Sequence, residues 1–321
     1  FLEDAVEFDV DAVCDGTEVL IGGIMQHIEE AGIHSGDSFA VLPAYKTSDR
    51  EIATMREHTQ RIALSLGVVG LLNIQFASFQ GTIHVIEINP RASRTVPFLE
   101  KATGVDLGRV ATRCMMGIKL AEQGVSEVQN LGHTFVKGPV FPFRRFPRTD
   151  SLLGPEMKST GEVMGIGKDF GEAFARAQMA AGQVLPSTGT VFISVNDGDK
   201  QDMLPIARDL HELGYGMLAT GGTAEFLQQQ GVPAAVVAKV GQGSPHIGQA
   251  IREGQVQMVI NTPLGKQSRY DEGAIRRESR ALDIPCITTL SGGRAAVDGI
   301  RAMRRGLDGV VALQNLNRNL T

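Results

Sequence analysis

The sequence predicts a mixed α/β and α+β chain, with an antiparallel sheet and helices in its first part and a doubly wound parallel sheet in its last part. The first 90 residues contain pairs of strand-like segments joined by short turns, which is typical of β-hairpins. From Gly189 onward, buried-type strands alternate with helix-like segments, and this alternation favours a parallel sheet. With 321 residues, 42% hydrophobic side chains and 38 glycines, the chain is long enough for two cores of a soluble protein.

The first predicted hairpin pairs Ala5–Val13 with Val19–His27, because apolar and polar residues alternate in both segments. Asp9 and Asp11 share a face with Glu7, and we interpret the two aspartates as the solvent-facing side of a half-buried strand. Glu7 is the exception, since a carboxylate at the start of this sheet could accept hydrogen bonds from ribose hydroxyls.

A loop and one helix follow the first hairpin, and another helix follows the second hairpin. The segment 32–38 is too rich in glycine and serine for a helix. Apolar residues at helical spacing predict an amphipathic helix over 50–66, packed behind the next hairpin. A second helix is predicted over 107–120, with Met115 and Met116 in the core.

The second hairpin carries the strongest chemical signal. Segments 73–78 and 82–88 are separated by a short turn, and residues two apart on a strand share a face. Glu87 and Asn89 therefore point the same way, and in most registers Gln75 lies beside them on the partner strand. One carboxylate and two amide oxygens are hard ligands of the kind that Mg²⁺ or Mn²⁺ accepts beside phosphate oxygens.

Two permanent cations follow this strand. Pro90 ends it, and Arg91 and Arg94 come next, where phosphate charge would need neutralising. On the generic pattern alone, a polar strand end followed by a solvated turn explains these residues about as well.

The stretch 121–188 shows weaker periodicity, with a short helix predicted over 170–181. Its segment 141–148 mixes phenylalanine, proline and arginine, and we interpret it as an extended connector rather than a nucleic-acid patch.

The last part contains five strand-like segments and five helix-like segments in alternation. The strands are 191–195, 216–219, 235–237, 256–260 and 286–289, and the helices are 200–213, 223–230, 246–252, 270–282 and 294–305. Ligands of such sheets bind at the carboxyl ends of the strands.

Polar residues follow four of these strands, namely Lys200, the turn Thr220 to Thr223, Lys239 and Asn261. The Thr-Gly-Gly-Thr turn has glycines that let the backbone approach an anion and a helix that offers unpaired amides. An ordinary N-cap and turn is an equally good explanation of the turn alone, and the two lysines favour a phosphate site.

The bulk properties exclude several classes of protein. The net charge is −5 with acidic and basic residues interspersed, which argues against a nucleic-acid surface. No apolar run approaches the roughly 20 residues of a membrane span, and no signal peptide is visible. The three cysteines are widely spaced, so we expect a reduced, cytoplasmic protein.

The literal string Glu-Ile-Asn-Pro-Arg-Ala-Ser-Arg over 87–94, with Gln75 twelve positions earlier, resembles the metal-nucleotide end of ATP-grasp ligases. Followed by Thr-Val-Pro-Phe at 95–98 and Lys-Ala-Thr-Gly-Val at 101–105, it looks like the large subunit of carbamoyl phosphate synthetase. The part from 189 resembles a methylglyoxal-synthase-like domain. The resemblance implies domains at 1–120 (ATP-grasp C-terminal subdomain), 121–188 (remainder of the synthetic domain and connector) and 189–321 (allosteric domain).

By this resemblance, the chain phosphorylates carbamate with ATP as part of a glutamine-dependent ligase of pyrimidine and arginine synthesis. Gln75, Glu87 and Asn89 would hold the Mg²⁺ or Mn²⁺ ions, and Arg91 and Arg94 would neutralise the transferred phosphoryl. The remaining nucleotide contacts would be Leu2 on the adenine, Glu7 on the ribose, and Gly32, Ile33, His34 and Ser35 along the nucleotide. A nucleotide monophosphate effector would bind Lys200, Thr220, Thr223, Lys239 and Asn261.

The family also implies partners, namely a glutaminase small subunit and an N-terminal half of the large subunit, and we expect a homo-oligomer. The chain looks like a fragment, so we expect it to be inactive alone. A nucleotide-sensing module without catalysis is the alternative. A methylglyoxal-synthase-type lyase is a third hypothesis, for which Asp271 is the candidate base.

Overall fold

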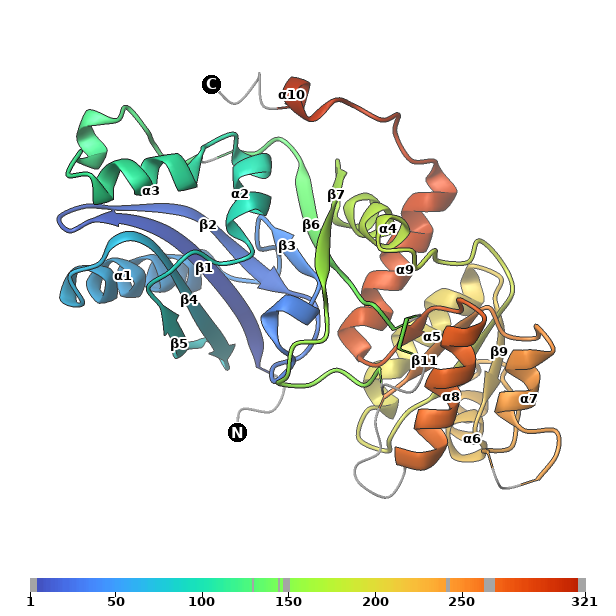
Figure 1. Cartoon of the computed structure of the whole chain (residues 1–321). Helices are drawn as coiled ribbons and strands as arrows, with labels where there is room; N and C mark the ends of the chain where they lie inside the picture. The colour runs from blue at the N-terminus through green and yellow to red at the C-terminus, as the bar shows by residue number, and fades with distance from the viewer. Residues whose placement is uncertain are drawn as a thin grey trace. The chain divides into compact units, whose positions relative to one another are not determined.

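The structure is a computed structural model (Figure 1) that describes residues 5–128, 130–143, 145–146, 151–240, 243–262 and 269–316, with backbone alone for 269–272. The chain divides into two compact units. The first unit contains Phe1–Lys137, Ile166–Phe170 and Asp308–Thr321, and the second contains Gly138–Gly165 and Gly171–Leu307.

The first unit is built on an antiparallel sheet with the strand order β5-β4-β1-β2-β3-β6. The strands are β1 (Val6–Asp15), β2 (Val19–His27), β3 (Ala40–Leu42), β4 (Val69–Phe79), β5 (Thr82–Asn89) and β6 (Thr134–Val140). The helices are α1 (Asp49–Ser65), α2 (Val96–Thr103) and α3 (Leu107–Met115), with short 3-10 turns η1 (Ser35–Asp37) and η2 (Leu120–Glu122).

Both predicted hairpins are present. β1 pairs with β2, and β4 pairs with β5 through a turn at Gln80 and Gly81. These two residues have φ values of 50° and 75°. Positive φ at both central residues belongs to the turn type whose twist matches that of the flanking strands, and glycine adopts it without strain.

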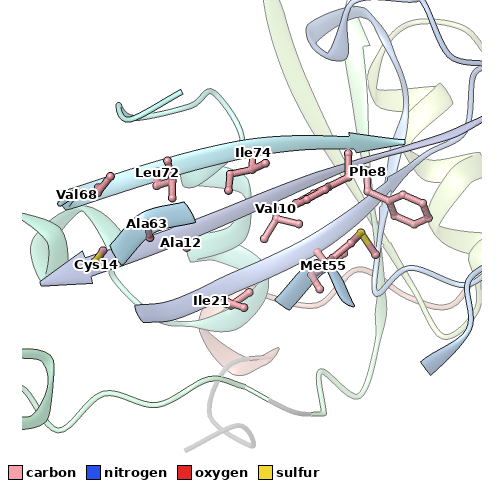
Figure 2. Close-up of a cluster of buried hydrophobic side chains, with 12 residues drawn as sticks. Phe8, Val10, Ala12, Cys14, Ile21, Met55, Ala63, Val68, Leu72 and Ile74 are labelled. Atoms are coloured by element: carbon pink, nitrogen blue, oxygen red, sulfur yellow. The ribbon is translucent and has the colours of Figure 1, made fainter. Parts of the chain in front are cut away.

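One face of this sheet packs against α1 and forms the hydrophobic core of the first unit. Figure 2 shows this cluster, in which Met55 and Ala63 of α1 lie beside Phe8, Val10 and Ala12 of β1. The helix begins with a capping box, because the Ser48 hydroxyl accepts from the Glu51 amide while the Glu51 carboxylate accepts from the Ser48 amide. The predicted helix behind the second hairpin is therefore confirmed.

The opposite face of the sheet is covered by α2 and α3, which pack unusually close to β2. A Cβ atom added at Gly22 would lie 2.7 Å from Leu107 Cδ1, and one at Gly23 would lie 2.6 Å from Leu99 Cδ2. Leu99 and Leu107 are buried, so the two glycines leave room for both leucines to contact the strand.

The helix α2 is missing from the sequence prediction, and α3 ends five residues earlier than predicted. The placement of Met115 and Met116 in the core is wrong, because they are 68% and 78% exposed. The helix stops at Met115, and Gly117 then turns the chain with a φ of 90°, so both side chains extend past the packed helix face.

The second unit contains a parallel sheet, as predicted, and the order of its strands is β10-β9-β8-β11-β12. Its strands are β8 (Thr190–Ser194), β9 (Gly216–Ala219), β10 (Ala235–Val236), β11 (Met258–Asn261) and β12 (Cys286–Ile287). The helices are α5 (Lys200–Glu212), α6 (Gly221–Gln229), α7 (Ile247–Arg252), α8 (Arg269–Ala281) and α9 (Leu290–Arg305). The short α10 (Leu313–Leu316) follows in the chain and belongs to the first unit.

The strand β7 (Gly161–Gly167) is also absent from the prediction, as are β3 and β6, and it lies against α4 (Phe170–Ala180). A Cβ added at Gly165 would lie 2.0 Å from the Ala173 carbonyl oxygen. Of the predicted connector, Phe141 and Phe143 stack with ring centroids 4.9 Å apart, while Arg144 and residues 147–148 lie outside the described residues.

None of the helices in the described ranges combines the length and the hydropathy that crossing a bilayer requires.

Candidate functional site

The three predicted metal ligands lie on one face of the β4–β5 hairpin. Gln75 is directly opposite Glu87, and Asn73 is directly opposite Asn89. Opposed residues in an antiparallel pair share a face, as do residues two apart on one strand. The register therefore brings the oxygens of Gln75, Glu87 and Asn89 to the same side, at the edge strand of the sheet.

The loop after β2 joins this cluster through Ser35. The amide nitrogen of Gln75 donates to the Ser35 hydroxyl at 2.9 Å, which leaves the amide oxygen as the atom that can face a cation. On its other side, the buried Lys137 amine donates to the Ser35 carbonyl oxygen at 2.7 Å. The hairpin and the predicted nucleotide loop, 40 residues apart in sequence, thus form one site.

The rest of the predicted nucleotide loop is also held by polar contacts. The Glu7 carboxylate accepts from the Gly32 amide at 3.1 Å, and Gly32 has a φ of 99° that favours glycine. His34 Nδ1 accepts from the Gly36 amide at 3.0 Å and so caps η1. Ile33 is half-buried, and Leu2 lies outside the described residues.

Arg91 and Arg94 are both exposed on the segment that joins β5 to α2. We call residues 90–95 the arginine loop. Its hydroxyl side chains reach the first strand, since Ser93 donates to Asp11 Oδ1 at 2.6 Å and Thr95 donates to Asp11 Oδ2. The arginines therefore lie on a loop that is fastened at its far end.

The interpretation of Asp9 and Asp11 as a solvent-facing pair is wrong. They are 2% and 1% exposed. Their face of β1 is covered because α3 packs on this strand and Ser93 and Thr95 reach Asp11 from the arginine loop. Alternation along the strand cannot reveal such a cover. The Asn73 amide nitrogen lies 3.4 Å from Asp9 Oδ1 and 3.2 Å from Asp11 Oδ1.

Burial and charge shift the pKa values of this cluster in opposite directions. Burial together with the neighbouring Asp9 charge raises the pKa of Asp11 to about 6. Burial alone would lower the pKa of His27, but the Asp9 carboxylate, 2.9 Å from His27 Nε2, raises it to about 9. The same contact outweighs the effect of burial on Asp9 and holds its pKa below the usual value. His27 and Asp9 are thus a buried ion pair at neutral pH.

Four of the five predicted effector residues, all but Lys239, lie near one another at the carboxyl ends of the second unit's strands. The helix α6 begins at Gly221 with Thr220 as its N-cap residue, two residues before the predicted start at Thr223. Thr220 and Thr223 are buried, with hydroxyls 3.5 Å apart, and the Ser194 hydroxyl lies 3.2 Å from that of Thr220. The first amides of α6 thus border a group of hydroxyls.

One lysine and one asparagine lie near this group of hydroxyls. The Lys200 amine would lie 3.5 Å from a Cβ added at Gly222, and it pairs with the exposed Asp197 at 2.7 Å. Asn261 is 1% exposed, and its amide nitrogen has no hydrogen-bond partner among the described residues. Lys239 is half-buried on the segment after β10, while the Asp271 side chain lies outside what the structure describes.

Sequence reasoning missed the polar residues that hold the candidate site from behind. Lys137 follows no visible pattern because it is a lysine inside a buried strand. Ser93 and Thr95 belong to the string that carries the arginines, but their partner is 82 or more residues away. The sequence feature that could have indicated these contacts is the run of carboxylates at every second residue, Glu7, Asp9 and Asp11, which puts three acidic groups on one face of the strand.

Two family models match the chain. The model described as "Carbamoyl-phosphate synthase L chain, ATP binding domain" matches residues 1–123, and the model described as "MGS-like domain" matches residues 202–288. Among solved structures, the biotin carboxylase domain of a single-chain bacterial carboxylase is similar at a TM-score of 0.44 and 17% identity, over 58% of this chain and 48% of that chain.

Curated relatives match nearly the whole chain. The carbamoyl phosphate synthase large chain of Acidobacterium capsulatum is 54% identical over 311 residues, and that of Archaeoglobus fulgidus is 54% identical over 305 residues. Each match covers 95% of this chain and 28% of the relative, so the chain spans less than a third of their length. By these matches, the chain belongs to the carbamoyl phosphate synthase large-chain family.

Proposed function

We propose that this chain supplies an ATP-binding part and a regulatory part of a glutamine-dependent carbamoyl phosphate synthetase. The ligase would phosphorylate carbamate with ATP and feed pyrimidine and arginine synthesis in the cytoplasm. Its partners would be a glutaminase subunit and the remainder of the large chain, in a homo-oligomer. The names of the relatives and the two family models support the general assignment.

The observation that carries the proposal is the register of the β4–β5 hairpin. It brings the oxygens of Gln75, Glu87 and Asn89 to one face, beside the Ser35 loop. This donor set fits Mg²⁺ or Mn²⁺, which accept carboxylate and amide oxygens. One carboxylate compensates only part of a divalent charge, so we expect phosphate oxygens to complete the site. When bound, the ion would neutralise phosphate charge as a Lewis acid.

The remaining residues of the site would bind and orient the nucleotide. Arg91 and Arg94 are exposed next to the hairpin, where guanidinium groups can neutralise the charge of the transferred phosphoryl. Glu7 would accept from the ribose, Leu2 would contact the adenine, and residues 32–35 would follow the nucleotide.

Manganese binding tests this assignment without requiring turnover. Electron paramagnetic resonance of Mn²⁺ with the purified chain is expected to show little binding by the ion alone and clear binding of MnATP. Glu87→Gln should weaken MnATP binding at least tenfold, since it removes the carboxylate of the site. Glu57→Gln removes an exposed carboxylate on α1 and should change nothing. Equal losses in both variants would contradict the metal assignment.

We also propose that the chain alone makes no carbamoyl phosphate, because the relatives contain more than twice as much further sequence. An assay of ATP-dependent carbamoyl phosphate formation with this polypeptide alone should find no product. Sustained turnover would refute the proposal.

A second candidate function is nucleotide sensing by the second unit. The supporting observation is the amide nitrogen of buried Asn261, which has no partner within the described residues. Asn261 is directly opposite Ser194, whose hydroxyl lies 3.2 Å from that of Thr220. Buried donors are normally satisfied, so a ligand acceptor is a natural partner. Lys200 and Lys239 would add positive charge for a nucleotide monophosphate effector.

A thermal melt tests effector binding, because a ligand that binds only the native state raises the midpoint. Uridine or inosine monophosphate should raise the midpoint of the chain, and inorganic phosphate should do so less. Lys200→Met should abolish the shift, while Arg208→Met, on the exposed far end of the same helix α5, should keep it. An unchanged midpoint at millimolar nucleotide would refute the sensing function.

A further inference from the structure

Asp11 makes contacts that neither the family comparison nor the candidate site explains. Its carboxylate accepts from the Ser93 hydroxyl at 2.6 Å, from the Thr95 hydroxyl, and from the Asn73 amide at 3.2 Å. Both carboxylate oxygens are used, and the side chain is 1% exposed. Burying a carboxylate is costly unless it is fully hydrogen-bonded, so these contacts account for how the group tolerates its position.

The Thr95 hydroxyl bonds Asp11 and does not cap the helix that follows it. Thr95 is the N-cap residue of α2, yet within the described residues its side chain makes no cap hydrogen bond to that helix. An N-cap hydroxyl normally accepts from an amide in the first turn. Here the hydroxyl donates to Asp11 instead, while the Thr95 amide donates to Ser93 Oγ at 3.2 Å.

Asp11 is well placed to act as a fixed reference point. It lies on β1, which pairs along its length with β2 on one side and β4 on the other. Asp11 is directly opposite Asn73, and Asn73 is directly opposite Asn89, the residue from which the arginine loop leaves the sheet. The loop is therefore held at its start by the strand ladder and at its end by Asp11.

We propose that Asp11 is a positioning residue that fixes the arginine loop and thereby places Arg91 and Arg94 beside the hairpin oxygens. The role of the arginines toward phosphate rests on the proposed function. The fixing of the loop does not, so the two parts can be tested separately.

Limited trypsin digestion measures the loop itself, because Arg91 and Arg94 are cleavage sites on it. Asp11→Asn keeps the shape of the side chain but removes the charge. Hydrogen bonds to a charged group are worth enough that cleavage after Arg91 and Arg94 should accelerate at least about tenfold. Lys46, exposed in the loop before α1, provides an internal reference in the same unit. Its cleavage rate should stay unchanged.

Further variants separate positioning from a general loss of stability. Asp9→Asn changes a buried carboxylate two residues away that contacts His27 rather than the loop, and it should not accelerate cleavage at the arginines relative to Lys46. Ser93→Ala combined with Thr95→Val removes the hydroxyls from the loop side and should act like Asp11→Asn. This loop variant also tests the proposal if Asp11→Asn does not fold.

A double-mutant cycle gives the decisive comparison. Once both hydroxyls are removed, adding Asp11→Asn should accelerate cleavage little further. Additive effects, or equal acceleration at Lys46, would overturn the positioning role.

Nucleotide titration then tests the consequence for the arginines. By calorimetry, Asp11→Asn should weaken MgATP binding at least about tenfold while leaving adenosine binding unchanged, because only the phosphates need the arginines. If the parent chain binds no MgATP, the proposed function is wrong. The cleavage rates would still show whether Asp11 fixes the arginine loop. If MgATP binding survives in a variant with an accelerated loop, the loop does not place the arginines.

Discussion

Raising the pH from 7 to 10 is expected to destabilise the first unit through the buried pair of His27 and Asp9. The pKa of His27 is raised from 6.5 to about 9 in the folded chain. A raised pKa means that the folded state retains a proton that the unfolded state has released. Its stabilising contribution is complete below about pH 6.5 and is lost as the pH rises through about 9.

The size of the effect follows from the two pKa values. Between them, the free energy of unfolding should fall by at most about 1.4 kcal/mol for each pH unit. Summed from pH 7 to pH 10, the loss is about 2.5 kcal/mol, which is a substantial part of the stability of a typical domain.

Pulse labelling of Cys14 provides an assay confined to this unit. Cys14 is fully buried on β1, so a saturating thiol reagent modifies it when the unit unfolds. Urea titrations at several pH values, read by mass spectrometry of the Cys14 peptide, give the unfolding free energy of the unit. The matched control is the double variant Asp9→Asn with His27→Gln, which removes both charges. Equal pH slopes in the parent and the double variant would refute the ion pair.

Three further predictions concern stability. Gly165→Ala should lower the free energy of unfolding by about 1–3 kcal/mol or more, because the new methyl group would overlap the Ala173 carbonyl. Gly161→Ala on the same strand has room for the methyl group and should be nearly neutral when both variants are compared by urea titration. Ser48→Ala should cost about 1 kcal/mol by removing the capping hydroxyl of α1, and circular dichroism melts would show a correspondingly small fall in the midpoint. Phe76→Ala should cost about 3–5 kcal/mol, since the ring is fully buried in the hydrophobic core of the first unit, and a loss below 1 kcal/mol would contradict that packing.

Local patterns predicted the hairpins and the parallel sheet because each depends on neighbours in sequence. The alternation in β4 and β5 and the Gln-Gly turn determine a register, and that register brings Gln75 to Glu87. The same reasoning failed for β6, whose sequence contains Gly138 and Pro139, both uncommon in strands. That strand forms because β3 pairs with it, and such a contact leaves no periodic signal.

The polar interior of the site was beyond local reasoning for a related reason. Alternation shows that Asp9 and Asp11 share a face, but it does not show what covers that face. Lys137 is fully buried and bonds a carbonyl 102 residues away, and no spacing rule links the two. In most proteins, charged residues on a strand face solvent. Here Asp9, Asp11 and Lys137 are buried and hold the residues of the candidate site in place.

Substitutions at the adjacent glycines of β2, Gly22 and Gly23, would affect parts of the first unit that they do not touch. The arginine loop leads directly into α2, and Leu99 of α2 occupies the space left by Gly23. A bulkier residue at that position would push the helix outward and draw the end of the loop with it, although no atom of the loop itself had changed. Variants at Gly22 or Gly23 should therefore weaken nucleotide binding, although β2 lies two strands away from the β4–β5 hairpin. A list of the residues that contact the ligand would not include these glycines.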